Sequence, residues 1–158
     1  MDFLFTDRAG NADTVVNFLV RPRLAIPKDS YPDYSDWLDK VRFELNKEIK
    51  KFILCISKGF IIGAIIFQQH KLMKDFLELK NISISPNYSF RGIGMFLLRN
   101  AEIEGAKQYG TKYATADCKS NNLPVIKFLG RNKYKMVMSL DVYKKQAGLD
   151  SIFIKELK

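Results

Sequence analysis

The 158-residue chain has little of what metal sites and disulfide-rich domains require, since it contains one histidine and two cysteines. It has no Cys-x-x-Cys pair, and its histidine, His70, lies in a polar run at residues 68–71. These absences predict that the chain holds no metal site. Cys55 and Cys118 lie in apolar, strand-like segments, which favours buried free thiols in a reducing compartment over a disulfide.

Long apolar runs are also missing, because no segment approaches the roughly 20 apolar residues of a membrane-spanning helix. The segment Met1–Asp7 lacks the basic start and the small-residue cleavage site of a signal peptide. No internal repeat, low-complexity tract or linker interrupts the chain, so we expect a single domain over residues 1–158. Together these features predict a cytoplasmic protein that does not associate with membranes.

Positive charge exceeds negative charge, with 26 Lys and Arg against 17 Asp and Glu and a formal net charge of +9. The lysines are spread along the chain without a long block. Three explanations stay open at this point: an anionic cofactor or substrate, a nucleic-acid or ribosomal partner, and ordinary solvation of a lysine-rich surface.

The hydrophobic pattern predicts an α/β fold with a sheet of mixed direction. Strands are expected at Phe3–Thr6, Phe52–Ser57, Ile61–Gln68, Leu77–Ser85, Lys112–Cys118, Met136–Tyr143 and Ser151–Leu157. Helices are expected at Ala12–Val20, from Ser35 to about Lys50, at Met95–Tyr109 and from Asn122 to Leu129. The last two strands should pair antiparallel across the loop between them.

Local signals refine these elements. Ser35 is expected to cap the second helix, and Lys58-Gly59 predicts a tight hairpin. The alternation in the strand Leu77–Ser85 changes phase near Asn81, as it does at a β-bulge. The second helix should bury one face, made of Leu38, Val41, Leu45 and Ile49. The third helix should bury Leu98, Ala101, Gly105 and Tyr109 and should expose Arg99, Glu102 and Lys107.

The most informative segment joins the strand ending near Ile84 to the third helix through Gly92-Ile93-Gly94. Free N–H groups and a partial positive charge at a helix N-terminus favour anions, and glycines allow the backbone to approach one closely. A pyrophosphate would fit there, although a purely structural tight turn explains the same pattern. The dinucleotide fingerprint fails because Leu97 stands where its third glycine belongs, and no Gly-Lys-Ser/Thr follows as in a P-loop.

These residues resemble the central motif of the GNAT (Gcn5-related N-acetyltransferase) family. Ile84-Ser85-Pro86 matches its Val-x-Pro element, and Ser89–Gly94 matches its Arg/Gln-x-x-Gly-x-Gly/Ala element, except that Ser89 replaces Arg or Gln. A second element, Asn122–Leu129 followed by Lys133-Tyr134, also matches in spacing. It departs from the family pattern at Leu129, where tyrosine is common, and at Lys133, where glycine is common.

The resemblance implies a mixed, mostly antiparallel sheet of about six to seven strands flanked by about four helices. It also implies acetyl-CoA as the donor, with the pyrophosphate on the glycine turn and the pantetheine arm along the preceding strand, which should splay open after Ile84. The cofactor-binding residues are then expected to be Ile82, Ser83, Ile84, Ser89, Phe90, Arg91, Gly92, Ile93, Gly94, Met95, Asn122 and Lys127. Asn122 should hydrogen-bond the pantetheine, and Lys127 should meet a phosphate or lie on a solvated helix face.

The resemblance further implies direct transfer of the acetyl group to an amine. A lysine-like amine has a pKa near 10.4 and must lose a proton before it attacks. Glu78 is the candidate general base, because it lies on the strand that leads to the motif, and a plain surface glutamate is the alternative. Tyr134 is a candidate substitute for the missing tyrosine acid at Leu129. The alternatives are another tyrosine, such as Tyr88 or Tyr143, or a reaction without a dedicated acid. The acceptor is expected at the aromatic residues Tyr31, Tyr34 and Trp37.

The acceptor itself stays open between a small amine, a protein or peptide amine and an RNA-linked aminoacyl group, and a homodimer is also open. A non-catalytic module that binds acyl-CoA and a nucleic-acid-binding domain are the alternative functions.

Overall fold

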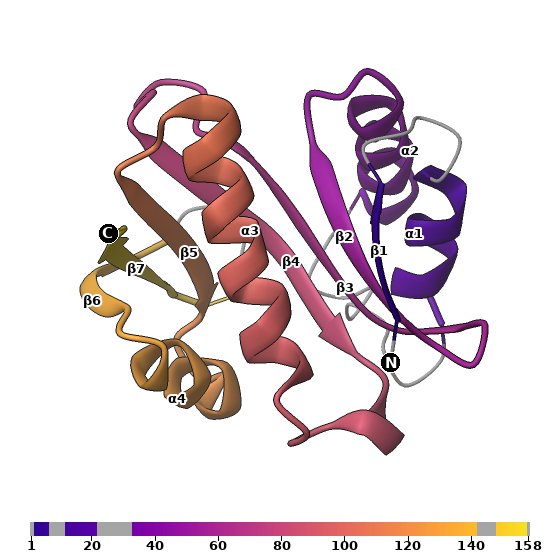
Figure 1. Ribbon diagram of the computed structural model, residues 1–158. Helices are drawn as coiled ribbons and strands as arrows, with labels where there is room; N and C mark the ends of the chain where they lie inside the picture. Colours follow the sequence, from indigo (N-terminus) through magenta and orange to yellow (C-terminus); the bar gives the residue numbers. More distant parts are fainter. Residues whose placement is uncertain (1, 7–11, 22–32, 142–147, 158) are drawn as a thin grey trace.

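The computed structural model describes residues 2–6, 12–21, 33–141 and 148–157. They form a seven-stranded sheet of order β1-β2-β3-β4-β5-β7-β6 (Figure 1). The strands are β1 (Asp2–Thr6), β2 (Lys51–Ser57), β3 (Phe60–Gln69), β4 (Phe76–Ile84), β5 (Tyr113–Lys119), β6 (Lys135–Leu140) and β7 (Asp150–Glu156). The helices are α1 (Ala12–Leu19), α2 (Tyr34–Asn46), α3 (Ile93–Tyr109), α4 (Leu123–Arg131) and the 3-10 helix η3 (Pro86–Tyr88). This order confirms the predicted α/β class and element sequence.

The sheet divides into two halves because its one parallel pair is short. Strands β4 and β5 pair in parallel only from Phe76↔Tyr113 to Leu79↔Ala116. Beyond that point β4 stays with β3 as far as Ile84, and β5 stays with β7 as far as Lys119. A wedge therefore opens between β4 and β5. The expectation that the strand splays only after Ile84 is wrong, since the separation begins after Leu79.

The wedge begins at a β-bulge. Strand β3 pairs Phe67 with Leu79 and Ile66 with Asn81, so Lys80 is an extra residue in β4. A bulge bends the strand that carries it and increases its twist, which directs the end of β4 away from β5. The predicted phase change near Asn81 is confirmed.

Helices cover both faces of the sheet (Figure 1). Helix α3 lies on one face, and its core cluster includes Ile53, Cys55, Ile65 and Phe67 from β2 and β3. Helices α1 and α2 lie on the other face, and their cluster includes Phe52, Leu54, Ala64 and Ile66. Because consecutive residues of β2 and β3 enter different clusters, these strands read as continuous apolar runs rather than as alternating ones.

Two local predictions about β2 and α2 have different outcomes. The hairpin at Lys58-Gly59 is confirmed, with φ of 50° and 79° at the two positions, as a type I′ turn requires. Helix α2 ends at Asn46 rather than near Lys50, so Ile49 lies past its end and is 48% exposed. The cause is a turn at Glu48, whose φ of 58° leaves the helical region.

Helix α2 also begins earlier than expected, with Asp33 at the N-cap position, so Ser35 lies inside the helix. Both cysteines are free, with Cys55 buried and Cys118 half-buried. None of the helices in the described ranges is long and apolar enough to cross a membrane.

Candidate active site

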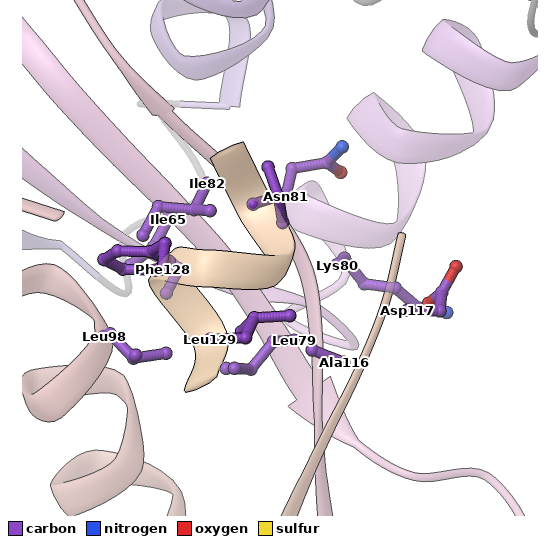
Figure 2. A pocket seen from close by; sticks show the side chains of 11 residues that line it. Ile65, Leu79, Lys80, Asn81, Ile82, Leu98, Ala116, Asp117, Phe128 and Leu129 are labelled. Carbon is purple, nitrogen blue, oxygen red and sulfur yellow. The ribbon is translucent and has the colours of Figure 1, made fainter. Parts of the chain in front are cut away.

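A pocket of about 50 Å³ lies where β4 and β5 part (Figure 2). It has room for a group the size of a few water molecules. The residues that line it come from both half-sheets and from the helices on one face: Ile65, Leu79, Lys80, Asn81, Ile82, Leu98, Ala116, Asp117, Val125, Phe128 and Leu129. The split in the sheet is thus a narrow, partly enclosed space rather than a filled core.

The pocket is apolar at one end and polar at the other. Leu98 from α3 and Leu129 from α4 form the apolar end. Lys80 and Asp117 point away from these two leucines, toward the opposite face of the sheet (Figure 2). A polar reactant can therefore approach from that face while an apolar group is enclosed on the other.

Asp117 is a site residue that sequence reasoning missed. It belongs to β5, where Ala114 and Ala116 are buried under α3. Because side chains alternate along a strand, Thr115 and Asp117 must face the other side of the sheet. That alternation was visible in the sequence. The sequence did not show that β4 and β5 separate and so bring Asp117 to the pocket, because that separation depends on how β4 bends.

The turn before α3 is open at Gly92. Gly92 has φ of 77°, a conformation that favours glycine, and a Cβ built there would meet nothing within 4 Å. The first helical hydrogen bond runs from Phe96 N to Gly92 O at 3.0 Å. The N–H groups of residues 93–95 therefore have no acceptor within the helix. Open space, free N–H groups and the helix dipole together favour an anion at this turn.

Gly94 has a different role from the one expected. A Cβ at Gly94 would lie 3.2 Å from the ring of Phe128. This glycine therefore allows α3 and α4 to pack closely, rather than opening the backbone to an anion. Its N–H group, in contrast, still belongs to the free first turn of the helix.

The residues before Gly92 form an exposed loop. Ser89 N donates a hydrogen bond to Pro86 O at 3.2 Å, and Phe90 is fully exposed with φ of 61°. The guanidinium of Arg91 lies 5.7 Å from the centre of the Tyr88 ring, a cation–π distance. Arg91 thus places a cation beside the open turn.

The end of β4 offers backbone rather than side chains. Ile82 and Ile84 pack against the core cluster under α3, whereas Ser83 pairs with Ala64 and faces the other side. Among the described residues, the side of β4 that faces β5 has no partner strand after Leu79. We call this stretch, residues 80–84, the open edge of β4.

The two residues expected on α4 lie at its exposed side. Asn122 Oδ1 accepts a hydrogen bond from Val125 N at 3.4 Å, so Asn122 caps the helix that was predicted to begin there. Lys127 is exposed one turn further along. Leu129, which stands where tyrosine is common in the family pattern, is buried and forms part of the pocket wall.

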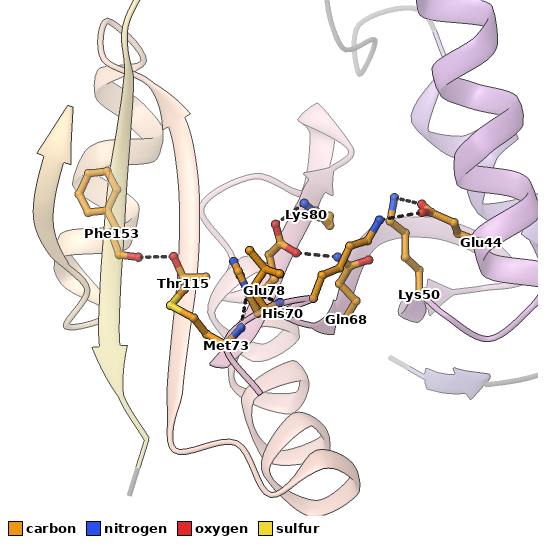
Figure 3. A network of polar contacts seen from close by, with 11 residues as sticks. Glu44, Lys50, Gln68, His70, Met73, Glu78, Lys80, Thr115 and Phe153 are labelled. Carbon is orange, nitrogen blue, oxygen red and sulfur yellow. Dashed lines mark hydrogen bonds and ion pairs between the residues drawn. The ribbon is translucent and has the colours of Figure 1, made fainter. Parts of the chain in front are cut away.

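Glu78 lies in a polar network on the face opposite α3 (Figure 3). Gln68 Nε2 donates to its carboxylate at 2.6 Å, and Lys80 forms an ion pair with it. Burial alone would raise the pKa of Glu78, but Lys80 and Gln68 outweigh it and hold that pKa below its usual value. Glu78 is therefore a stabilised carboxylate and a weaker base, and it does not line the pocket.

Tyr134 lies inside the core rather than at the pocket. It is 3% exposed, and its hydroxyl donates to Glu102 Oε1 at 2.7 Å. Lys155 Nζ donates to both Glu102 oxygens, at 2.8 and 2.7 Å. Burial, together with the Glu102 carboxylate, raises the pKa of Tyr134 far above its usual value. This environment opposes the expected role as a proton donor.

Glu102 itself contradicts the predicted outer face of the third helix. It is 8% exposed because Lys155 from β7 compensates its charge and Tyr134 donates a further hydrogen bond. Neither partner is near Glu102 in sequence, so the helical pattern alone could not reveal the burial.

The expected acceptor residues are not gathered at the pocket. Tyr34 and Trp37 lie at the start of α2 with ring centres 6.1 Å apart, and Trp37 packs against the cluster under α1 and α2. Tyr31 lies outside the described residues. No group of His, Cys, Asp and Glu within the described ranges is arranged to hold a metal ion.

A model of the acetyltransferase (GNAT) family matches residues 15–134. A comparison with curated proteins found no match. The fold is similar to that of an aminoglycoside 6'-acetyltransferase type Ii, at 19% sequence identity and a TM-score of 0.76 over 99% of this chain and 97% of that chain. An aminoglycoside 6'-N-acetyltransferase complexed with coenzyme A is similar at 17% identity and a TM-score of 0.75, again over 99% and 97%. The ribosomal-protein-S18-alanine N-acetyltransferase from Escherichia coli is similar at 17% identity and a TM-score of 0.74 over 98% and 92%.

Proposed function

The chain belongs to the acetyltransferase (GNAT) family, whose enzymes use acetyl-CoA, and we propose that it transfers the acetyl group to a primary amine held at the opening between β4 and β5. The single observation that carries this proposal is the arrangement of that opening. Its pocket is walled by both half-sheets and by Phe128, whose ring would lie 3.2 Å from a Cβ at Gly94, two residues after the open turn at Gly92.

The residues present fit coenzyme A. The free N–H groups of residues 93–95 and the open space at Gly92 suit a pyrophosphate. Arg91 and Lys127 supply cations near this turn and on the adjacent helix. The open edge of β4 offers unpaired backbone groups to the amide groups of the pantetheine arm.

Acetyl-CoA supplies an activated thioester, so the protein has to position the reactants and move one proton. An N–H group on the open edge of β4 can stabilise the negative charge that develops on the carbonyl oxygen. The pocket encloses the small acyl end and excludes water from it.

The amine must lose a proton before it attacks, since an alkylamine has a pKa near 10.4. We assign this proton transfer to Asp117, which lines the pocket and faces the same side as Glu78. The leaving thiolate needs no dedicated acid, because a thiol has a pKa of about 8.5.

The test of the proposed function is Gly92→Glu, which places a side chain and a negative charge in the anion site. The dissociation constant for CoA, measured by calorimetry, should rise at least about tenfold, a loss of about 1.4 kcal/mol. Gly59→Glu is the matched control, because Gly59 has φ of 79° and also has nothing within 4 Å of its Cβ position. It should leave CoA affinity unchanged.

Turnover is measured as CoA thiol release from acetyl-CoA with alkylamines, a polyamine, an aminoglycoside and short peptides. Release that depends on the amine supports the transferase. Tight CoA binding without release on any amine would instead identify a non-catalytic acyl-CoA-binding module. Equal CoA affinity in folded Gly92→Glu and wild-type protein would contradict the assigned site.

Asp117→Asn tests the assigned base. The value of kcat/KM should fall by about 10²–10⁴-fold, as general-base catalysis contributes, while CoA affinity stays constant. Asp75→Asn is the control, because Asp75 precedes β4 at the end remote from the opening and pairs with Lys112 at 3.7 Å. If both variants keep wild-type kcat/KM, the proton leaves by another route.

A further inference from the structure

The opening between β4 and β5 has a wide end and a closed end, and α3 runs from one to the other. Near the start of α3, a Cβ at Gly94 would lie 3.9 Å from Ile84 Cγ1, so the turn at Gly92 lies at the wide end, where β4 finishes. Further along α3, a Cβ at Gly105 would lie 2.5 Å from Leu77 Cδ1, where β4 and β5 are still paired. A donor held by its pyrophosphate at the wide end therefore points its acyl group toward the closed end.

The pocket lies at this closed end, and its walls there are apolar. Leu79 and Ala116 form the last pair of the parallel ladder and line it. Leu98 from α3 and Leu129 from α4 complete the enclosure. All four side chains are buried, and buried side chains in a close-packed core move little. The closed end therefore has a fixed size.

That size exceeds what an acetyl group needs. The pocket has a volume of about 50 Å³, and an atom the size of a water molecule needs about 10–15 Å³ of such volume. The pocket thus holds about three to five atoms. An acetyl group has three non-hydrogen atoms, a butyryl group has five and a hexanoyl group has seven. Butyryl fills the pocket, whereas hexanoyl exceeds it.

The walls also select against charge. Lys80 and Asp117, the charged residues among those described around the pocket, point away from Leu98 and Leu129 (Figure 2). A carboxylate at the end of an acyl chain would therefore be buried against leucine and alanine side chains. Burial of a charge without a hydrogen-bonding partner is strongly unfavourable.

We infer that the protein uses straight-chain aliphatic acyl-CoA donors from acetyl-CoA to butyryl-CoA, with the acyl chain bound between Leu98 and Leu129. Longer acyl groups and dicarboxylic ones are disfavoured. This inference rests on the proposed function, because it takes the pyrophosphate to lie at Gly92. It can nevertheless be tested by binding alone, without knowledge of the acceptor amine.

The first experiment measures dissociation constants by calorimetry for CoA and for acetyl-, propionyl-, butyryl-, hexanoyl- and succinyl-CoA, with no amine present. Each carbon added from acetyl to butyryl should lower the dissociation constant by up to about fourfold. Hexanoyl-CoA should bind no more tightly than butyryl-CoA. Succinyl-CoA has the same number of acyl carbons as butyryl-CoA and should bind at least about tenfold more weakly.

Two variants change the size of the pocket in opposite directions. Leu98→Phe should abolish the preference for butyryl-CoA over acetyl-CoA, whereas Leu129→Ala should make hexanoyl-CoA bind more tightly than butyryl-CoA. Ile103→Phe is the matched control, because Ile103 lies on the same helix as Leu98 and is 61% exposed. It should keep the wild-type order of affinities. Thermal unfolding checks that each variant is folded, and the wild-type series decides the inference if one is not.

The second experiment measures CoA thiol release with an amine that supports turnover. The value of kcat/KM for butyryl-CoA should equal or exceed that for acetyl-CoA, since added binding energy raises kcat/KM. Affinities or kcat/KM values that do not improve from acetyl to butyryl would overturn the inference and leave the transferase standing. Absence of CoA release with every amine and every donor would refute the transferase, and the use of these donors with it.

Discussion

Replacing Tyr134 with phenylalanine separates a structural tyrosine from a catalytic one. The substitution removes only the hydroxyl that donates to Glu102 Oε1 at 2.7 Å. A hydrogen bond to a charged group contributes about 1.5–3 kcal/mol. Lys155 keeps both of its contacts with Glu102, so the carboxylate stays paired and the larger cost of an isolated buried charge is avoided. We expect a loss of about 2 kcal/mol.

The assay is thermal and chemical unfolding together with turnover. A loss of about 2 kcal/mol corresponds to a fall in Tm of roughly 4–8 °C for a chain of this size. Tyr113→Phe is the control, because Tyr113 is half-buried and stacks on Phe76 at 5.0 Å without a hydroxyl bond to a described residue. Its stability should change by less than about 0.5 kcal/mol.

The kinetic part decides the role of Tyr134. Burial and Glu102 raise the pKa of its hydroxyl, so Tyr134 stays protonated throughout the working range and adds no limb to the pH–rate profile. The profile of Tyr134→Phe should superimpose on that of the wild type. If the variant kept its Tm but turned over about a hundredfold more slowly, as the loss of a general acid would cause, this reasoning would be refuted and Tyr134 restored as the acid.

Two further predictions concern packing and pH. Gly105→Val should destabilise the protein by about 1–3 kcal/mol in denaturant titration, because a Cβ at Gly105 would lie 2.5 Å from Leu77 Cδ1. Gly130→Val on α4, where nothing lies within 4 Å, should be nearly neutral, and equal losses in both variants would contradict the close packing of α3 on β4. The pKa of Glu78 is held below its usual value of 4.5, so its stabilising contribution is complete above that pH and is lost as the pH falls through the lowered value. The free energy of unfolding of Glu78→Gln should therefore fall less than that of the wild type between about pH 5 and pH 3. If the two free energies fall in parallel with pH, the contacts of Glu78 contribute nothing to stability.

Much of the fold was predictable because its signals are local. Lys58-Gly59 needed only the rule that tight hairpins favour positive φ, and both residues adopt it. The phase change near Asn81 indicated the bulge because alternation has a strict period of two. Asn122 indicated a helix start because its side chain can accept from the helix backbone, and it does.

The features that the sequence did not predict depend on contacts between residues that lie far apart in the chain. Glu102 appears as a surface residue in any helical pattern, and its burial depends on Lys155, which is 53 residues away. Asp117 became a site residue only because β4 leaves β5 after Leu79. Gly94 matched a motif for an anion site, yet its missing side chain makes room for the Phe128 ring. Periodicity and motifs report local geometry, and none of these contacts is local.

Lys80, the extra residue in β4, has a consequence for how the chain tolerates insertions and deletions. A strand one residue shorter would keep every later side chain on its present face, because Leu79, Asn81 and Ile82 would then alternate without interruption. It would lose the bend that the bulge imposes, and its end could continue alongside β5. The gap between the half-sheets therefore depends on the number of residues in β4, through the one extra residue at the bulge, and not on the identity of any side chain around it.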